Sequence, residues 1–301
     1  MYQTLVLQFT IFGTMAVGLL MRKLKVVGPD ARKDLTALVL NVILPCNIIN
    51  SFMTSVSKEL VRDCLIILVI SIAIQFMAVL YGKLITRHET ADRAVNIRYG
   101  IICSNAGFLG NPVAEGVFGA AGLMLASIYL IPQRIMMWSE GLALYSGSSD
   151  KRQTVRKVLT HPCVIACFIG IILMLTGYTP PSVIMTPVRT IGRCNTAMSM
   201  MVIGMILAEI DMKDILDRSV ILYTVHRLVI IPLIILIILK ILPVSPLVRG
   251  LSVLLAAMPA GATTSMLASQ YDRDPQFAVK LVVFSTICSI PAIILWSLVL
   301  G

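Results

Sequence analysis

Hydrophobic positions along the chain fall into ten long runs separated by short polar segments. Each run is close to the roughly 20 apolar residues that an α-helix needs to cross a bilayer. The pattern therefore predicts an all-α integral membrane protein with ten transmembrane helices. The expected spans are residues 4–21, 35–53, 61–82, 96–121, 123–145, 162–178, 190–209, 219–241, 249–270 and 276–300.

The fourth and ninth runs contain polar and helix-breaking residues at membrane depth. Residues 103–114 read CSNAGFLGNPVA, and residues 258–265 read MPAGATTS. Backbone groups freed in such segments are too costly to face lipid, so they must be buried in protein or line a wet cavity. Two Gly/Pro-interrupted spans in corresponding halves are the best sequence pointer to the binding site of a secondary transporter. We expect these two helices to be broken and to cross.

The composition agrees with a membrane protein. The 301 residues are 57% hydrophobic and 13% charged, with a mean hydropathy of +0.91. Soluble domains carry about 25% charged residues, so most of this surface is expected to face lipid. The net charge of +10 comes from Lys and Arg in short loops, which the positive-inside rule explains, with anionic lipid as their main neighbour. The sequence shows no base-reading motif, so nucleic acid is not an expected partner.

The distribution of Lys and Arg between the loops predicts the orientation. Loops on the side reached by the first connection hold fifteen of these residues, and the opposite loops hold six. Both termini are therefore expected outside the cytoplasmic (inner) membrane, and the odd-numbered connections in the cytoplasm. Basic residues follow the first apolar run rather than precede it, so no cleaved signal is predicted there.

The longest cytoplasmic loop, residues 146–161, separates two sets of five spans. Five is an odd number of crossings, so the second set must enter from the opposite side, as in the inverted repeats of many transporters. The predicted division is a first five-helix repeat at residues 1–147, a cytoplasmic linker at 148–161 and a second repeat at 162–301. The broken helices 4 and 9 would then run antiparallel and meet at mid-membrane.

Four residues of the fourth span are candidate substrate-binding residues. Asn111 and Pro112 are expected to restart a helix, whose first N–H groups and partial positive charge suit an anion. Asn105 adds an amide in the break, and Gly107 lets another backbone approach closely. The alternative is a Pro-kinked helix whose Asn side chains only cap the break.

The ninth span offers a matching set. Pro259 is expected to restart a helix, and Gly261, Thr263 and Thr264 follow it. The two hydroxyls could bond substrate, or they could bond back to carbonyls of the preceding turn, as Ser and Thr in helices often do. Two interrupted helices with matching polar residues arise by chance less often than one.

The fifth span places Gln133, Arg134 and Glu140 at membrane depth, where ionisable residues are rare and are functional candidates by default. Arg134 could attract a carboxylate substrate. Glu140, Gln133, Glu115 of the fourth span and Asn47 of the second are candidates for holding a coupling ion, either H+ or Na+. The alternative for Arg134 and Glu140 is snorkelling or a structural ion pair. The same structural interpretation is favoured for charged residues near span ends, namely Arg193, Glu209, His226, Arg227 and Lys280.

Sequence signatures of enzymes are missing, so no catalytic residue is expected. His88-Glu89 is followed by Asp92 rather than by the second His of an HExxH helix, and no GxSxG or P-loop is present. Without a P-loop the chain cannot itself power transport by ATP hydrolysis. The seven Cys form no CxxC or Cys/His cluster, so neither a cofactor, a metal site nor a disulfide framework is predicted.

Several short motifs resemble the auxin efflux carrier family. They are Leu44-Pro45, residues 105–112 (NAGFLGNP) with Phe118-Gly119, Gly204, residues 258–264 (MPAGATT), and a closing segment running from Asp274-Pro275 to Phe284-Ser-Thr286. The resemblance covers essentially the whole chain. It implies the fold of the bile acid:sodium symporters, with a scaffold domain of helices 1, 2, 6 and 7 and a core domain of helices 3–5 and 8–10 whose two broken helices cross.

The same resemblance implies a bacterial carrier of organic anions such as malate or malonate, with plant relatives that export auxin. Two departures from the family pattern are the acid in Ser139-Glu-Gly141 and Arg134, which does not map onto the motifs. Either could mark a different substrate or coupling ion.

The leading hypothesis is therefore a secondary active transporter of a small organic anion, in particular a carboxylate, that works by alternating access. One alternative is a sodium-coupled symporter of bile-acid type. Another is a non-transporting membrane sensor or receptor, although no cytoplasmic output domain is predicted. A homodimer through the scaffold helices is a further expectation.

Overall fold

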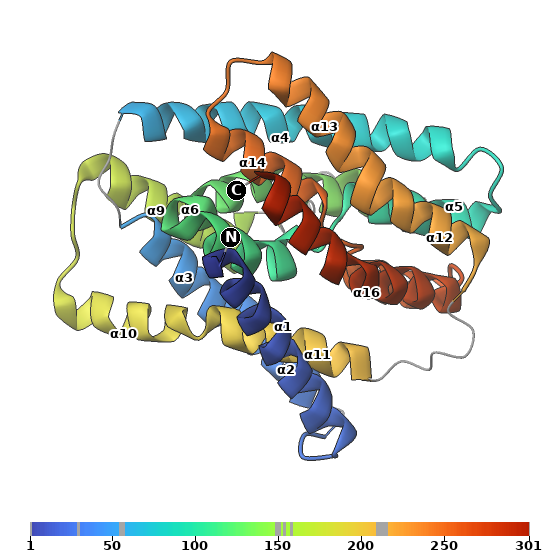
Figure 1. Ribbon diagram of the computed structural model, residues 1–301, viewed down its shortest axis with the longest axis horizontal. Coiled ribbons are helices and arrows are strands. Elements are labelled where there is room, and N and C mark those ends of the chain that lie inside the picture. The colour runs from blue at the N-terminus through green and yellow to red at the C-terminus, as the bar shows by residue number, and fades with distance from the viewer. Residues whose placement is uncertain are drawn as a thin grey trace.

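The computed structural model describes residues 2–28, 31–53, 58–147, 152, 155–156, 159–208 and 216–300. Over these residues the chain is all-helical, and the extended pairing is an isolated antiparallel bridge between Ser104 and Ala260. In Figure 1, α4 follows one edge of the molecule, α10 and α11 follow the opposite edge, and α6 lies between them.

Helices marked η are π-helical segments. The first half contains α1 (Tyr2–Lys23), α2 (Ala31–Leu38), η1 (Val39–Ile43), α3 (Leu44–Ser51), α4 (Lys58–Ile85), α5 (Ala91–Ile102), η2 (Ala106–Gly110), α6 (Asn111–Met136), η3 (Met137–Gly141) and α7 (Leu142–Ser146). The second half contains α9 (Pro162–Thr176), α10 (Ser182–Arg193), α11 (Asn195–Ala208), α12 (Arg218–Val225), η5 (His226–Ile230), α13 (Ile231–Ile241), α14 (Pro246–Ala256), α15 (Thr263–Gln270) and α16 (Pro275–Leu300). Most of the predicted linker at 148–161 lies outside the described residues.

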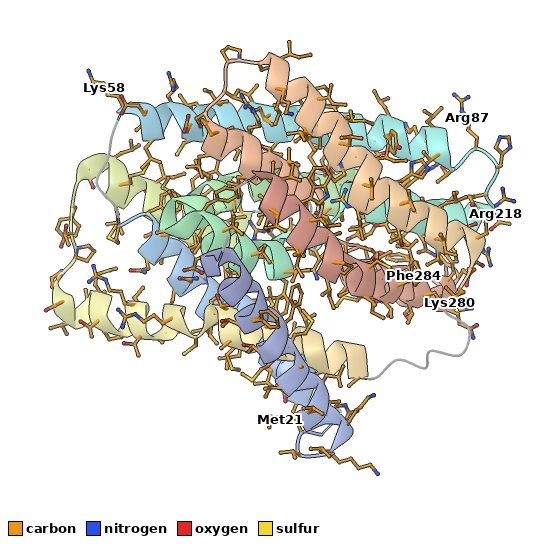
Figure 2. All side chains as sticks on the ribbon, in the orientation of Figure 1. Met21, Lys58, Arg87, Arg218, Lys280 and Phe284 are labelled. Carbon is orange, nitrogen blue, oxygen red and sulfur yellow. The ribbon has the colours of Figure 1, made fainter. Side chains whose placement is uncertain are left out.

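In the described part of the chain, five helices are long and apolar enough to cross a membrane. They are Asp34–Ser51, Lys58–Ile85, Ala106–Ser146, Arg218–Ile241 and Pro275–Leu300, and α9 and α14 are shorter apolar helices. Many large apolar side chains along these helices are exposed, for example Val69 and Phe76 on α4. Figure 2 shows Lys58 at one end of the molecule and Arg87 and Arg218 at the other. A lateral apolar surface between charged ends is the pattern of a multi-pass membrane protein.

Gly119 divides the long helical segment Ala106–Ser146. Its φ of 68° is left-handed and interrupts α6, and Gly adopts this conformation without the steric cost that a Cβ would bring. The chain therefore turns at Gly119, two residues before the predicted end of the fourth span.

The helices pack in two groups that meet at α6. One group contains α1, α3, α9, α10 and α11, and the other contains α4, α5 and α12–α16, while α6 contacts members of both groups. In the first group α1 crosses α11 so closely that a Cβ at Gly18 would overlap the backbone of Met201, and one at Gly204 would overlap that of Met15. Close backbone approach at small residues is how apolar helices associate within lipid.

Three π-helical segments stand directly before a proline. Segments η1, η2 and η5 each end two residues before Pro45, Pro112 or Pro232. Proline lacks an N–H and its ring clashes with the carbonyl four residues earlier, so that carbonyl loses its helical partner. At Pro232 the freed carbonyl is that of Leu228, and the Trp296 indole Nε1 donates to it at 2.8 Å.

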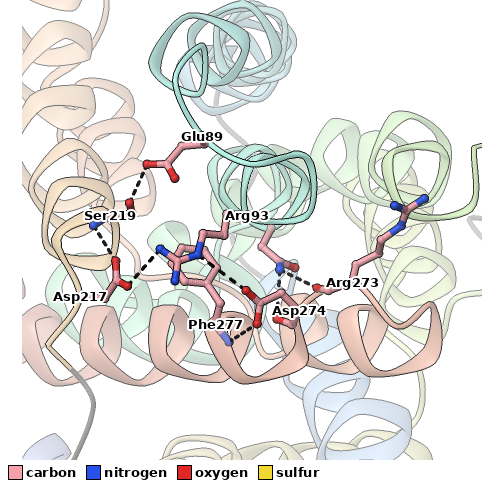
Figure 3. Close-up of polar contacts among 8 residues, drawn as sticks. Glu89, Arg93, Asp217, Ser219, Arg273, Asp274 and Phe277 are labelled. Atoms are coloured by element: carbon pink, nitrogen blue, oxygen red, sulfur yellow. Dashed lines mark hydrogen bonds and ion pairs between the residues drawn. The ribbon is translucent and has the colours of Figure 1, made fainter.

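A polar network fastens the ends of three helices in the second group (Figure 3). The Arg93 guanidinium on α5 lies 3.1 Å from the Asp217 carboxylate before α12 and 3.7 Å from Asp274 before α16. Ser219 Oγ donates to Glu89 Oε1 at 2.6 Å. Exposed ion pairs contribute little singly, but these contacts join the first half of one broken helix to the start of α12 and of α16.

Candidate functional site

The two interrupted segments meet at the centre of the molecule. Helix α5 ends at Ile102 and α14 ends at Ala256, and the short stretches that follow pair through the Ser104–Ala260 bridge. The Asn105 amide donates to the Pro259 carbonyl at 2.8 Å, and the Gly261 amide donates to the Cys103 carbonyl at 3.1 Å. Each break thus supplies hydrogen-bond partners for some free backbone groups of the other. Such partners are needed because these groups are buried away from water. We refer to residues 103–105 with 257–262 as the crossing.

The helix restarts lie elsewhere than the sequence predicted. After the first break the helix begins again at Ala106 with η2, so Asn111 and Pro112 lie about one and a half turns inside it. The prediction that Asn111 starts the helix was wrong, because a π-helical segment accommodates Pro112 without a break. Pro259 lies in the second break itself, and α15 begins at Thr263, so the prediction that Pro259 restarts the helix was also wrong.

Gly261 allows the two backbone segments of the crossing to approach each other closely. A Cβ at this position would stand 3.0 Å from the Cys103 carbonyl oxygen, which is the acceptor of the Gly261 amide. A side chain here would push apart the pair of backbones that the bridge joins. Gly261 therefore has a local structural role, and its role in substrate binding stays a prediction.

Two of the predicted residues bring unpaired polar atoms into buried positions. Both amide atoms of Asn111 and the hydroxyl of Thr264 are fully buried and have no hydrogen-bond partner in the described structure. Leaving such a group unpaired costs about 1–3 kcal/mol. Thr263, at the first position of α15, is only half-buried. Each restarted helix therefore carries a polar group whose hydrogen-bonding capacity is unused.

Gln133 is committed to the crossing. Its Nε2 donates to the Ser104 carbonyl at 2.7 Å, and its Oε1 accepts from Ser104 Oγ at 3.3 Å. These reciprocal bonds fix the second half of α6 on the first break. The amide that was a coupling-ion candidate thus already has protein partners on both of its polar atoms.

Arg134, the next residue, is 7% exposed and its Nη1 has no hydrogen-bond partner in the described structure. Its Nη2 lies 3.9 Å from where a Cβ of Gly107 would be. The guanidinium is therefore held over the first turn of η2, where the helix has N–H groups without helical acceptors. A buried guanidinium with spare donors beside a helix N-terminus forms a strongly positive position.

Arg134 on α6 also acts electrostatically on the N-terminal end of α9, a helix of the first group. Burial lowers the pKa of the His161 imidazole, the N-cap of α9, to about 4, and the positive charge of Arg134 adds to this shift. His161 is therefore neutral at physiological pH. Arg134 thus lies where the two groups of helices face each other.

Two coupling-ion candidates are brought together across the same boundary. Asn47 Nδ2 on α3 donates to Glu115 Oε2 on α6 at 2.8 Å. The pair joins the first group of helices to α6 through one carboxylate. Glu140 is half-buried on η3.

Arg227 is the residue whose role the sequence interpretation missed. It is 5% exposed on η5, and its Nε and Nη1 donate to the carbonyls of Met258 at 2.8 Å and Ile101 at 3.1 Å. The structural interpretation as a snorkelling residue near a span end was wrong, because the side chain points into the crossing. The position of Arg227 five residues before Pro232 was the available signal, since that proline marks irregular backbone at membrane depth.

The chain is similar to known membrane transport proteins. The family model described as "Membrane transport protein" matches residues 5–297. A protein of Methanothermobacter thermautotrophicus described as an "Uncharacterized transporter" is 27% identical over 289 residues, covering 94% of each chain. Another uncharacterized transporter, from Methanocaldococcus jannaschii, is 22% identical over 293 residues, again covering 94% of each chain. Both of these relatives are archaeal.

Proposed function

Since the chain belongs to the membrane transport protein family, the family of the auxin efflux carriers, we propose that this transporter is a secondary active carrier of a small organic anion. The expected substrate is a carboxylate. The observation that carries this proposal is Arg134, a buried arginine whose Nη1 has no protein partner and whose Nη2 lies over Gly107.

The neighbourhood of Arg134 has the chemistry of an anion site. The restarted helix at Ala106 contributes a positive helix end, and the bare surface of Gly107 leaves room beside the guanidinium. A guanidinium offers parallel N–H donors that match the two oxygens of a carboxylate. Asn105, Asn111, Thr263 and Thr264 would contribute further polar groups, while Pro112, Pro259 and Gly261 shape the backbone of the breaks.

Alternating access would use the two groups of helices. We assign α1, α2–α3, α9 and α10–α11 to a scaffold, and the remaining helices to a core that moves against it. Ten spans then follow, with the fourth made of α5 and the part of α6 before Gly119, and the ninth made of α14 and α15. Two inverted five-helix repeats separated near residues 148–161, and termini outside the cytoplasmic membrane, complete the proposed topology.

The coupling site proposed within this architecture is the contact between Asn47 and Glu115. It joins the scaffold to the core at 2.8 Å, so a change of protonation at Glu115 would act directly on the boundary that must slide. A proton fits this position because one carboxylate and one amide offer few ligands for a metal ion. Glu140 and Gln133 are weaker candidates, because Gln133 already bonds Ser104.

The surroundings of the carrier are also part of the proposal. The exposed apolar face of α10, with Val183 84% and Ile184 58% exposed, would contact membrane lipid or a second copy of the scaffold. A homodimer through the scaffold helices is compatible with that face.

The test is uptake of radiolabelled anions into proteoliposomes that contain the purified protein. Dicarboxylates, monocarboxylates and aromatic carboxylates are compared with a neutral amide of similar size. We expect saturable uptake of at least one carboxylate and none of the amide. Arg134→Gln should weaken apparent affinity about 10- to 100-fold, in line with loss of a charge-assisted hydrogen-bonded pair, and Arg134→Lys should fall between.

The matched control is Arg249→Gln. Arg249 is also a partly buried arginine, but it bonds the carbonyls of Leu239 and Val244, away from the crossing. Its affinity for substrate should be that of the parent protein. Equal affinities in the parent, Arg134→Gln and Arg249→Gln would exclude Arg134 from the substrate site.

A further inference from the structure

The crossing has two electrostatically different sides. On one side the chain leaves α5 and α14, so the C-terminal ends of two helices converge, and their last carbonyls have no N–H partner within the helix. On the other side η2 and α15 begin, so two helix N-termini converge, and their first N–H groups have no acceptor within the helix. Helix C-termini carry about half a negative charge each and N-termini about half a positive charge. Each side therefore attracts an ion of the opposite sign.

Arg227 occupies the C-terminal side. It donates from Nε to the carbonyl of Met258, just after α14, and from Nη1 to that of Ile101, in the last turn of α5. One guanidinium thus bridges the ends of both broken helices. Its single positive charge matches the roughly one negative charge that two helix C-termini present together.

A metal ion would compete for the same atoms. In transporters with discontinuous helices, unwound carbonyls and half-helix C-termini are the ligands of sodium. Here the Met258 and Ile101 carbonyls already bond the guanidinium at 2.8 and 3.1 Å. The side chain is anchored to η5, and the Leu228 carbonyl on the same segment is held by Trp296. The positive charge at this position therefore belongs to an arginine side chain and not to a bound ion.

We propose that Arg227 is a built-in cation that completes the crossing in place of sodium. The crossing then needs only its anion, and no sodium ion has to bind or leave at this position during a transport cycle. The inference rests on the proposed function for its consequence in transport, but the charge replacement itself is a property of the protein without substrate. Arg227 acts as a positioning residue, because it touches the backbones of the breaks and not the proposed anion site.

The main experiment measures thermal stability of the purified protein without substrate. The parent protein is compared in sodium chloride and in choline chloride at equal ionic strength, and equal melting temperatures are expected. Arg227→Ala should melt well below the parent. Millimolar guanidinium chloride should restore a large part of that loss, whereas urea, a neutral molecule of nearly the same shape, should not.

Two further variants keep the proposal falsifiable. If Arg227→Ala does not fold, Arg227→Lys and Arg227→Gln replace it, and the charged Lys variant is expected to melt higher than the neutral Gln variant. Arg249→Ala is the matched control, since it also removes an arginine that bonds two carbonyls. Guanidinium should raise the melting temperature of this variant no more than urea does.

Three results would overturn the proposal. They are a saturable rise in the melting temperature of the parent protein with sodium, rescue of Arg227→Ala by urea as well as by guanidinium, and a Gln variant as stable as the Lys variant. Uptake is measured separately in sodium and choline buffers, and equal rates are expected. A protein that transports no anion yet shows the guanidinium rescue would refute the proposed function and leave this inference intact.

Discussion

Two buried arginines on opposite sides of the crossing differ in how fully their charge is used. Arg134 is 7% exposed and Arg227 is 5% exposed, so burial does not distinguish them. Arg227 donates to two backbone carbonyls at helix C-termini, whereas Arg134 keeps Nη1 unpaired beside a helix N-terminus. A cation at a C-terminus is stabilised by the helix, and one at an N-terminus is destabilised until an anion joins it.

The comparison shows that the hydrogen-bond partners of a buried charge distinguish a structural role from a binding role better than its depth of burial does. A guanidinium that is bonded by carbonyls holds the fold together and has little left to offer a ligand. A guanidinium with spare donors in an unfavourable field lowers the stability of the empty protein and favours ligand binding. The same substitution at the two positions should therefore have opposite effects.

The largest effect is expected for Arg227→Met. Methionine fills much of the volume but leaves the Ile101 and Met258 carbonyls without their donor, at about 1–3 kcal/mol for each group. We expect a strongly lowered melting temperature, measured by the fluorescence of a thiol-independent dye or by intrinsic tryptophan emission. Melting within experimental error of the parent would show that the two bonds are dispensable.

The next largest effect is expected for Arg134→Met, with the opposite division between stability and binding. Replacing an unpaired buried charge by an apolar group of similar size is often neutral or stabilising. We expect an unchanged or higher melting temperature together with loss of measurable carboxylate affinity by isothermal titration calorimetry. If this variant melts as low as Arg227→Met, the two arginines do not differ as proposed.

Gly261→Ala and Gly107→Ala extend the comparison to the backbones beside each arginine. The Gly261 Cβ would stand 3.0 Å from a backbone oxygen, and the Gly107 Cβ 3.9 Å from the Arg134 guanidinium. Overpacking against a backbone that cannot yield costs about 1–3 kcal/mol, so Gly261→Ala should lower the melting temperature. Gly107→Ala should leave it unchanged and weaken anion affinity only modestly. The reverse order in the two melting curves would contradict the geometry of the crossing.

The smallest effect concerns pH. The folded pKa of His161, about 4, lies below the ordinary value near 6.5, so the unfolded chain binds more protons between these values. Stability contributed by the neutral imidazole is present above pH 6.5 and is lost as pH falls toward 4, by at most about 1.4 kcal/mol per pH unit. His161→Gln should flatten the dependence of melting temperature on pH in this window.

Arg134→Met should flatten the same curve in part, because the arginine is the second cause of the low pKa. A parallel set of curves for the parent, His161→Gln and Arg134→Met would mean that His161 does not titrate in this window.

The sequence was sufficient for the membrane class, the family and the positions of the two breaks. The structure shows that Asn47 and Glu115, two separate candidates from the sequence, bond each other, and their role in holding a coupling ion stays a prediction. The proposed roles of Asn105, Asn111, Thr263 and Thr264 stay predictions. The breaks could be located from the sequence because Gly, Pro and Asn inside an apolar run have few physical explanations.

The sequence was not sufficient for Arg227 or for the two helix restarts. A charged residue in an apolar run indicates a partner but not which one, and the partners of Arg227 are backbone carbonyls 31 and 126 residues away in the sequence. The restart at Ala106 was missed because Pro112 suggested a helix start, while the chain satisfied the proline with a π-helical segment. Local propensity could not decide between these solutions without the tertiary packing.

The π-helical segments also change the phase of every helix that contains one. An extra residue in a turn rotates all later side chains by about 100° relative to an uninterrupted α-helix. In the helix that continues from α6 into η3, Gln133 lies before this shift and Glu140 lies within it. A helical wheel drawn through both residues therefore assigns them a common face that the backbone does not provide. In this chain, amphipathic patterns have to be computed separately on each side of η1, η2, η3 and η5.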